Sequence, residues 1–232
     1  LSFEHAALTE AGRRFDARAE PGQHIALVGA SGAGKTTLLN LAAGLDRPAR
    51  GRVRIDGIAP TDLPLAHRRR MLAYVGPQSP ILAGSLRRAL SLGLTPRPTD
   101  ERLLTVGRDF GLGRTIARLG GLDGRVAENG RDLSSGERSR LLLARATLAA
   151  PRLLLIDASE GLLDPAGRQA LRRLLRDTDA TVLLVTQDED VAREMDAVWF
   201  MRGGRMVAAG PPTVVLDGEG ARTRFFSPRQ AA

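Results

Sequence analysis

Gly29-Ala30-Ser31-Gly32-Ala33-Gly34-Lys35-Thr36 decides the fold, because it matches the pattern G-x-x-x-x-G-K-[ST] at every specified position. A loop of this kind wraps backbone N–H groups around a polyphosphate, and its lysine reaches the β- and γ-phosphates as a compact point charge. Lys35 is the single lysine among 34 basic residues, so the chain uses arginine everywhere else. A lysine at this one position predicts nucleotide binding. The residues predicted to surround the phosphates are Gly29, Ser31, Gly32, Ala33, Gly34, Lys35, Thr36 and Thr37.

The segments on either side of this loop predict a strand and a helix. Residues 25–28 form a short apolar run that ends in glycine, which is typical of a buried parallel strand. Residues 36–43 predict a helix closed by Gly44, so a bound phosphate would lie at the helix N-terminus, where N–H groups and the helix dipole favour negative charge. Residues 1–20 indicate one or two modest strands. Residues 53–57 alternate and end in the turn pair Asp56-Gly57, which indicates a strand that leads into a hairpin.

The rest of the chain alternates between two kinds of pattern. Residues 80–148 carry leucine- and arginine-rich helical patterns interrupted by glycines. Further along, strands and helices are predicted at residues 153–156, 166–176, 181–185, 198–201 and 206–208. Strands that alternate with helices imply an α/β fold with a mostly parallel sheet. We expect one domain over residues 1–232, with a core of about 1–78 and 149–232 and a helical subdomain of about 79–148.

Composition excludes several classes of protein. The net charge of +8 and the isoelectric point of about 11.3 are compatible with nucleic-acid binding. However, basic runs such as residues 68–70 are short and have no aromatic residues between them, so we expect no nucleic-acid partner. The absence of cysteine excludes disulfides, thiolate metal sites and cysteine nucleophiles. No apolar run approaches the ~18 residues that span a bilayer.

A second motif is a hydrophobic strand that ends in an aspartate, Leu-Leu-Leu-Ile-Asp at residues 153–157. An aspartate at the carboxyl end of such a strand can hold Mg²⁺, directly or through water, opposite the hydroxyl of Thr36. A turn aspartate after a buried strand has the same local sequence, but the phosphate-binding loop favours the metal role. Asp157 and Thr36 are therefore predicted metal ligands.

A third motif, Leu-Ser-Ser-Gly-Glu at residues 133–137, precedes an apolar helix and predicts a helix N-cap with a capping box between Ser134 and Glu137. Together with the first two motifs, it resembles the signature sequence of ABC transporter nucleotide-binding domains, usually written L-S-G-G-Q. The resemblance implies that Ser134, Ser135, Gly136 and Glu137 cap the γ-phosphate of ATP held by a partner domain. Relative to that pattern, Ser135 replaces a glycine and Glu137 replaces a glutamine.

Further segments resemble the same family in the same order. Gln78, within residues 74–80, resembles the Q-loop; Asp164, within residues 163–165, resembles the D-loop; and residues 203–210 resemble the closing hairpin. The resemblance implies a P-loop NTPase (RecA-like) core, an N-terminal antiparallel β subdomain and a helical signature subdomain. It also implies that ATP and Mg²⁺ are the cofactors and that Gln78 contacts both.

The expected partners follow from the type of member that the chain resembles. Residues 79–86 are similar to the segment that follows the Q-loop in exporter-type members, where a transmembrane domain usually precedes this domain. The chain begins at Leu1 rather than Met, so we expect a soluble fragment cut from a longer chain. The resemblance implies transmembrane domains and a second nucleotide-binding domain, on a different chain, as partners at the cytoplasmic face of the plasma membrane.

Two positions depart from the family pattern where it places hydrolytic groups. Ala158 stands where the family has the glutamate that deprotonates the attacking water, and Glu160 lies too far along to replace it without rearrangement. Gln187 stands where the family has a histidine, and it can bond a γ-phosphate but cannot titrate. No aromatic residue lies near residues 9–12, where the family commonly stacks adenine. We therefore predict no catalytic residue, and the pattern resembles the degenerate half of a heterodimeric exporter.

Two alternatives remain open at this point. One is a homodimeric ABC ATPase that hydrolyses ATP in its own site with another base, and the other is a non-transport module that uses ATP as a regulatory clamp. His5, His24 and His67 share no close spacing and are predicted to be surface or hydrogen-bonded polar residues rather than metal ligands.

Overall fold

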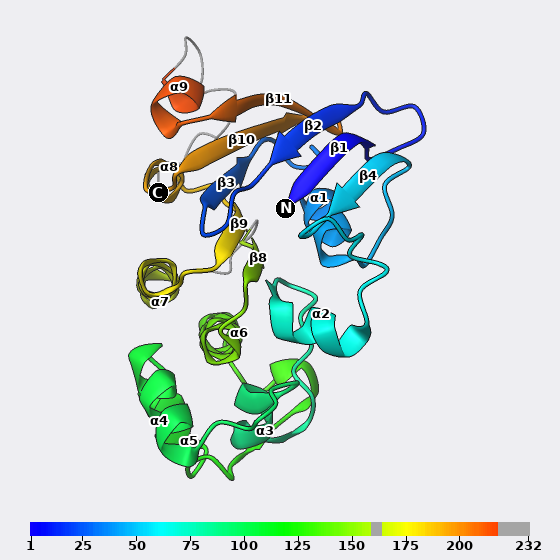
Figure 1. Ribbon diagram of the computed structural model, residues 1–232. Helices are drawn as coiled ribbons and strands as arrows, with labels where there is room; N and C mark the ends of the chain where they lie inside the picture. Colours follow the sequence, from blue (N-terminus) through cyan, green and yellow to red (C-terminus); the bar gives the residue numbers. More distant parts are fainter. Residues whose placement is uncertain (159–163, 218–232) are drawn as a thin grey trace.

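A six-stranded sheet is the centre of the computed structural model, which describes residues 1–158 and 164–217 (Figure 1). The strand order is β11-β10-β3-β9-β8-β5, and all neighbours are parallel except the hairpin of β10 and β11. The strands are β3 (His24–Val28), β5 (Leu72–Val75), β8 (Leu153–Asp157), β9 (Thr181–Val185), β10 (Ala197–Arg202) and β11 (Arg205–Gly210). The predicted mostly parallel α/β sheet and closing hairpin are confirmed.

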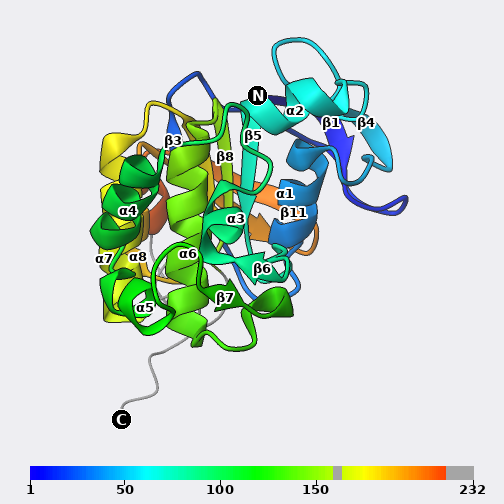
Figure 2. The same cartoon turned by 90° about the horizontal axis from the view of Figure 1, so that it is seen from below.

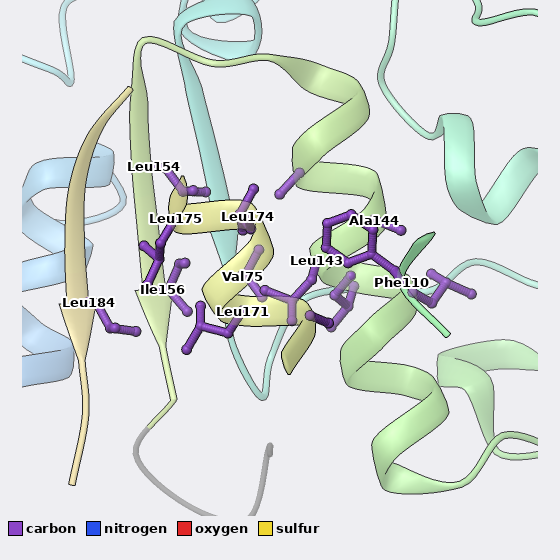
Figure 3. Close-up of a cluster of buried hydrophobic side chains, with 14 of the residues drawn as sticks. Val75, Phe110, Leu143, Ala144, Leu154, Ile156, Leu171, Leu174, Leu175 and Leu184 are labelled. Atoms are coloured by element: carbon purple, nitrogen blue, oxygen red, sulfur yellow. The ribbon is translucent and has the colours of Figure 1, made fainter. Parts of the chain in front are cut away.

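Alternate residues of each strand build two apolar cores, one on each face of this sheet. Leu154 and Ile156 belong to the core covered by α6 (Ser135–Ala149) and α7 (Pro165–Asp177). Figure 3 shows this core, which includes Val75, Phe110, Leu143, Ala144, Leu171, Leu174, Leu175 and Leu184. Leu155 belongs to the opposite core, which is covered by α1 (Lys35–Ala43). Burial of each leucine side chain contributes ~1.5–3 kcal/mol, so the sheet edge that carries the candidate site is held from both sides.

A separate three-stranded antiparallel sheet, in the order β2-β1-β4, lies at the N-terminal side. It consists of β1 (Ser2–Ala7), β2 (Phe15–Arg18) and β4 (Arg50–Arg54), which confirms the predicted antiparallel β portion. The expected strand at residues 53–57 begins and ends three residues earlier than predicted. Asp56 and Gly57 have φ of 50° and 83°, and such left-handed residues form a turn rather than extended backbone.

The middle of the chain is helical, as predicted, and α6 is its longest element (Figure 2). α6 packs against α3, α4, α7 and β5, so it joins the helical part to the sheet. The remaining elements of this region are α2 (Leu65–Met71), β6 (Gly84–Ser85), α3 (Leu86–Ser91), α4 (Asp100–Asp109), α5 (Gly113–Arg118), β7 (Arg125–Val126) and a 3₁₀ turn (Glu128–Gly130). Two short helices, α8 (Glu189–Arg193) and α9 (Pro212–Leu216), follow later in the chain.

The parallel register brings distant segments to one edge of the sheet. Asp157 lies beside Val185, and Val185 lies beside Leu27, so the carboxyl ends of β3, β8 and β9 coincide. The phosphate-binding loop, Ala158 and Gln187 therefore follow three neighbouring strands at the same edge, which is where ligands bind in open α/β sheets. None of the helices that the structure describes has both the length and the apolar character needed to cross a membrane.

Candidate nucleotide-binding site

The loop between β3 and α1 has a backbone that only glycine accommodates at its ends. Gly29 has φ of 144°, and a β-carbon there would collide with the carbonyl of Met201 on β10. Gly34, with φ of 96°, precedes α1, whose N-terminus has no side-chain cap and no acidic residue in its first turn. The N–H groups of that turn and the positive end of the helix are therefore available to an anion.

Lys35 lies inside this loop and is only 6% exposed. Its Nζ donates hydrogen bonds to the carbonyl oxygens of Gly29 at 2.7 Å and Ala30 at 2.8 Å. Burial lowers the pKa of Lys35, and the negative charge of Asp157 acts in the opposite direction. An ammonium group has three hydrogens, so the loop holds Lys35 in place and leaves one hydrogen to point at a phosphate oxygen.

Thr36 and Asp157 meet across the sheet edge. The Thr36 hydroxyl donates to Asp157 Oδ2 at 2.6 Å, although the two residues are 121 positions apart in the sequence. Asp157 is 2% exposed. The pKa of the neighbouring Tyr74 is raised to about 12, first by the burial of Tyr74 itself and then by the negative charge of Asp157. A hydroxyl and a carboxylate side by side are the hard oxygen ligands that Mg²⁺ takes together with water and phosphate oxygens. The described residues contain no cluster of three or more His, Cys, Asp or Glu side chains that could hold a metal ion.

The positions where the family pattern has hydrolytic groups lie at the same edge. The Ala158 N–H donates to the Val185 carbonyl at 3.1 Å, and its methyl group packs against the apolar core beneath α6 and α7. Gln187 is exposed just after β9. Glu160 lies outside the described residues. The side chain directly after Asp157 therefore offers no atom that could accept a proton from water.

Gln78 is exposed, and the described part of the chain gives its side chain no hydrogen-bond partner. Arginines of α6 hold the backbone on either side of it. Arg138 Nη2 donates to the carbonyls of Pro77 at 3.1 Å and Ser79 at 3.0 Å, and Arg145 Nη1 donates to that of Pro80 at 2.8 Å. The two arginines are seven positions apart on one helix, which places them on one face. α6 thus fixes the position of Gln78, a role that the sequence analysis missed.

Arg138→Ala is expected to loosen the backbone around Gln78. Loss of charge-assisted hydrogen bonds to the carbonyls of Pro77, Ser79 and Asn129 should lower the free energy of unfolding by about 2 kcal/mol. Exchange of the Ser79 amide, which donates to the Gly76 carbonyl at 3.0 Å, should become about tenfold faster. Hydrogen exchange followed by mass spectrometry measures this local change, with Arg176→Ala, an exposed arginine on α7, as the control. Equal exchange of the Ser79 amide in both variants would contradict this role.

The signature segment forms the N-terminus of α6. Ser134 Oγ accepts a hydrogen bond from the Glu137 N–H at 3.1 Å, and the Ser134 N–H donates to Glu137 Oε2 at 2.8 Å, which confirms the predicted capping box. Ser134 and Ser135 are exposed, whereas Gly136 is buried. Ser135 is the first residue of α6 and has no positive φ, so a serine fits where the family pattern has glycine.

Asp164 links this helix to α7. Its Oδ1 accepts from the Gly167 N–H at 2.7 Å and caps α7, and its Oδ2 pairs with Arg140 Nη1 at 2.7 Å. Burial raises the pKa of Asp164, but the hydrogen bonds from Arg140 and Gly167 outweigh it and lower that pKa overall. A β-carbon at Gly136 would run into the Asp164 carboxylate. The predicted D-loop aspartate and the signature glycine therefore touch within one chain, while Leu163 lies outside the described residues.

The signature residues and the phosphate-binding loop are not joined within the chain. Across residues 1–158 and 164–217, no hydrogen bond or ion pair connects residues 134–137 with residues 29–37. The exposed Ser134 hydroxyl and the first turn of α6 form a second polar surface, apart from the loop. The candidate site thus consists of the loop, Thr36, Asp157 and Gln78, and the signature does not complete it.

Comparison with known proteins agrees with this geometry. A family model described as ABC transporter matches residues 13–159. Antigen peptide transporter 1 of Rattus norvegicus is 34% identical over 85% of this chain and 28% of its own length. The mycobactin import ATP-binding/permease protein IrtB of Mycolicibacterium thermoresistibile is 34% identical over 91% of this chain and 37% of its own length. The chain therefore spans about a third of these larger relatives.

A shorter relative is covered almost completely. The thiamine import ATP-binding protein ThiQ of Shigella flexneri is 33% identical over 92% of this chain and 91% of its own length. The solved structure of a bacterial Atm1-family ABC exporter with ATP bound superposes with a TM-score of 0.83 over 96% of this chain and 40% of that chain, at 24% identity, which supports the fold. By its motifs, fold and these matches, the chain belongs to the family of ABC transporter ATP-binding domains, whose members couple ATP hydrolysis to transport.

Proposed function

We propose that this chain is the ATP-binding domain of an exporter-type ABC transporter, at the cytoplasmic face of the membrane, and that it works with transmembrane domains. Two of its relatives, named a peptide transporter and an ATP-binding/permease protein, are about three times longer than the segment that matches this chain. The likeness of residues 79–86 to exporter-type members supports the export direction, although two relatives of similar identity, IrtB and ThiQ, are named as import proteins.

The chain's own site binds ATP with Mg²⁺ in this proposal. Lys35 and the N–H groups of residues 30–34 bind the β- and γ-phosphates, and Thr36 and Asp157 hold the metal with help from Gln78. The 2.6 Å contact between Thr36 and Asp157 and the burial of Lys35 support these roles. When bound, Mg²⁺ would neutralise phosphate charge, while the chain's residues orient the nucleotide.

The chain's own nucleotide-binding site holds ATP with little or no hydrolysis. The single observation that carries this proposal is Ala158, whose methyl group follows the metal aspartate directly. A missing general base removes a contribution of ~10²–10⁴-fold to the rate. The Gln187 side-chain amide can still donate a hydrogen bond to a phosphate oxygen, so the site keeps groups that bind the nucleotide while lacking those that move a proton.

The signature acts in a second site, formed with a different nucleotide-binding domain. Ser134 is exposed, and in the described part of the chain no hydrogen bond or ion pair joins the signature to residues 29–37. The Ser134 hydroxyl and the N-terminus of α6 meet a γ-phosphate held by the partner domain, where a base of the partner serves hydrolysis. ATP held in both sites clamps the domains together, and hydrolysis in the partner's site separates them.

Ser134→Ala tests this role in the reconstituted transporter. Removal of one donor aimed at developing charge should lower turnover in the partner's site about 100-fold, with Mg-ATP binding by the chain's own loop unchanged. The loss of the helix cap costs about 1 kcal/mol of stability, which thermal unfolding reports separately. Ser2→Ala, on β1, is the matched control. Unchanged turnover with Ser134→Ala would mean that the signature does not serve a partner site.

A further inference from the structure

Glu137 places a carboxylate in the first turn of α6, the turn that faces a phosphate in the proposed function. The N-terminus of a helix attracts anions through its N–H groups and dipole. A carboxylate in that turn repels a second anion that approaches the same end. The glutamine of the family pattern carries no such charge, so a chain with glutamate needs a compensating cation.

Arg118, at the end of α5, supplies that cation. Its Nη2 donates to both oxygens of Glu137, at 3.1 Å to Oε1 and 3.2 Å to Oε2. The Thr115 hydroxyl, on the same helix, donates to Oε1 at 2.7 Å. The side chain of Glu137 is 18% exposed and that of Arg118 is 49% exposed, so solvent screens the ion pair only in part. The pair cancels the charge of Glu137 beside the helix end.

The other arginines on α6 near Glu137 bind other groups. Arg138 binds the backbone beside Gln78, and Arg140 pairs with Asp164. Across residues 1–158 and 164–217, Arg118 is the cation in contact with Glu137. Burial raises the pKa of Glu137, but hydrogen bonds from Ser134, Thr115 and Arg118 outweigh it and bring that pKa to about 2. Protonation therefore does not remove the charge at neutral pH.

We propose that Arg118 is a positioning residue of the signature: it neutralises Glu137 so that the N-terminus of α6 can accept the γ-phosphate of ATP bound by the partner domain. The inference rests on the proposed action of the signature in a partner site. It adds that α5 supports the functional surface through Arg118 and the buried Thr115. It also adds that a chain with glutamate at this position depends on an arginine that a chain with glutamine does not need.

A double-mutant cycle in the reconstituted transporter tests this role. Arg118→Ala is expected to lower turnover in the partner's site about tenfold, because Glu137 then faces the phosphate uncompensated. In the Glu137→Gln background, the same Arg118→Ala change should cost less than about twofold, since no charge is left to compensate. Raising the salt concentration should shrink the defect of Arg118→Ala, because salt screens the repulsion between the uncompensated Glu137 and the phosphate.

Two controls separate this role from a general effect on folding. Arg172→Ala removes an arginine that pairs with Glu194 away from the signature, and it should leave turnover unchanged. Mg-ATP binding to the chain's own loop should also stay unchanged in Arg118→Ala. An equal loss from Arg118→Ala in both backgrounds, at every salt concentration, would overturn charge compensation and leave Arg118 with a structural role only.

Ser134→Ala, measured in parallel, distinguishes the failure of this inference from that of the proposed function. A defect with Ser134→Ala but none with Arg118→Ala overturns the role of Arg118 alone. No defect with either variant overturns the action of the signature in a partner site, and the role of Arg118 with it.

Discussion

Ala158→Glu is expected to give the chain's own site the ability to hydrolyse ATP, with phosphate release rising about 100-fold or more. Ala158 follows Asp157 directly, and its N–H is bound to Val185 at 3.1 Å, so its backbone is fixed at the edge where the phosphate-binding loop lies. A carboxylate at this position would accept the proton of a water that attacks the γ-phosphate. The measurement is steady-state phosphate release at saturating Mg-ATP by the chain of residues 1–232.

Ala158→Gln is the matched control for this experiment. Glutamine has nearly the same size and shape as glutamate but cannot accept the proton, so it should bind Mg-ATP and release no more phosphate than the unmodified chain. Equal phosphate release from the glutamate and glutamine variants would contradict the claim that the missing general base limits the rate of ATP hydrolysis in this site.

Lys35→Ala is expected to weaken Mg-ATP binding about 100-fold, equivalent to about 3 kcal/mol, because a charge-assisted contact with the phosphates is lost. Lys35 is 6% exposed and anchored to the carbonyls of Gly29 and Ala30, so no other cation of the loop can take its place. Isothermal titration calorimetry with ATP and Mg²⁺ measures the change directly.

Lys35→Arg is the informative companion variant. The guanidinium keeps the positive charge but is wider and planar, and the two carbonyls hold Nζ in a narrow loop, so we expect binding to stay impaired. Thermal unfolding of both variants checks that the chain remains folded. If Lys35→Ala bound Mg-ATP with the same affinity as the unmodified chain, the placement of the nucleotide in this loop would be contradicted.

The sequence predicts most of the elements around the candidate nucleotide-binding site, because the residues that determine each element lie close together in the sequence. The glycine pattern of residues 29–34, the apolar run before Asp157 and the capping box of Ser134 each depend on residues a few positions apart. The structure confirms the strands, the helix after the loop and the N-cap. Strand β4 is a different case: the turn pair Asp56-Gly57 is visible in the sequence and is confirmed, but the strand begins at Arg50, before the apolar alternation starts, because its first residues pair with β1.

The contacts that surround the site could not be predicted in the same way. Arg138 reaches Ser79 across 59 positions, and Arg140 reaches Asp164 across 24. With 34 basic residues, nearly all arginine, the sequence offers too many equivalent candidates for each partner. Such pairings follow from how α6 packs on the sheet and on its neighbouring helices, which only the tertiary structure shows.

The central claim is that this site binds Mg-ATP without appreciable turnover. Equilibrium binding and phosphate release, measured side by side on the unmodified chain with Lys35→Ala as the baseline, test it most directly. The expected result is saturable Mg-ATP binding together with phosphate release no faster than that of Lys35→Ala. Phosphate release clearly above the Lys35→Ala baseline would contradict the claim, because another group would then supply the base that Ala158 lacks.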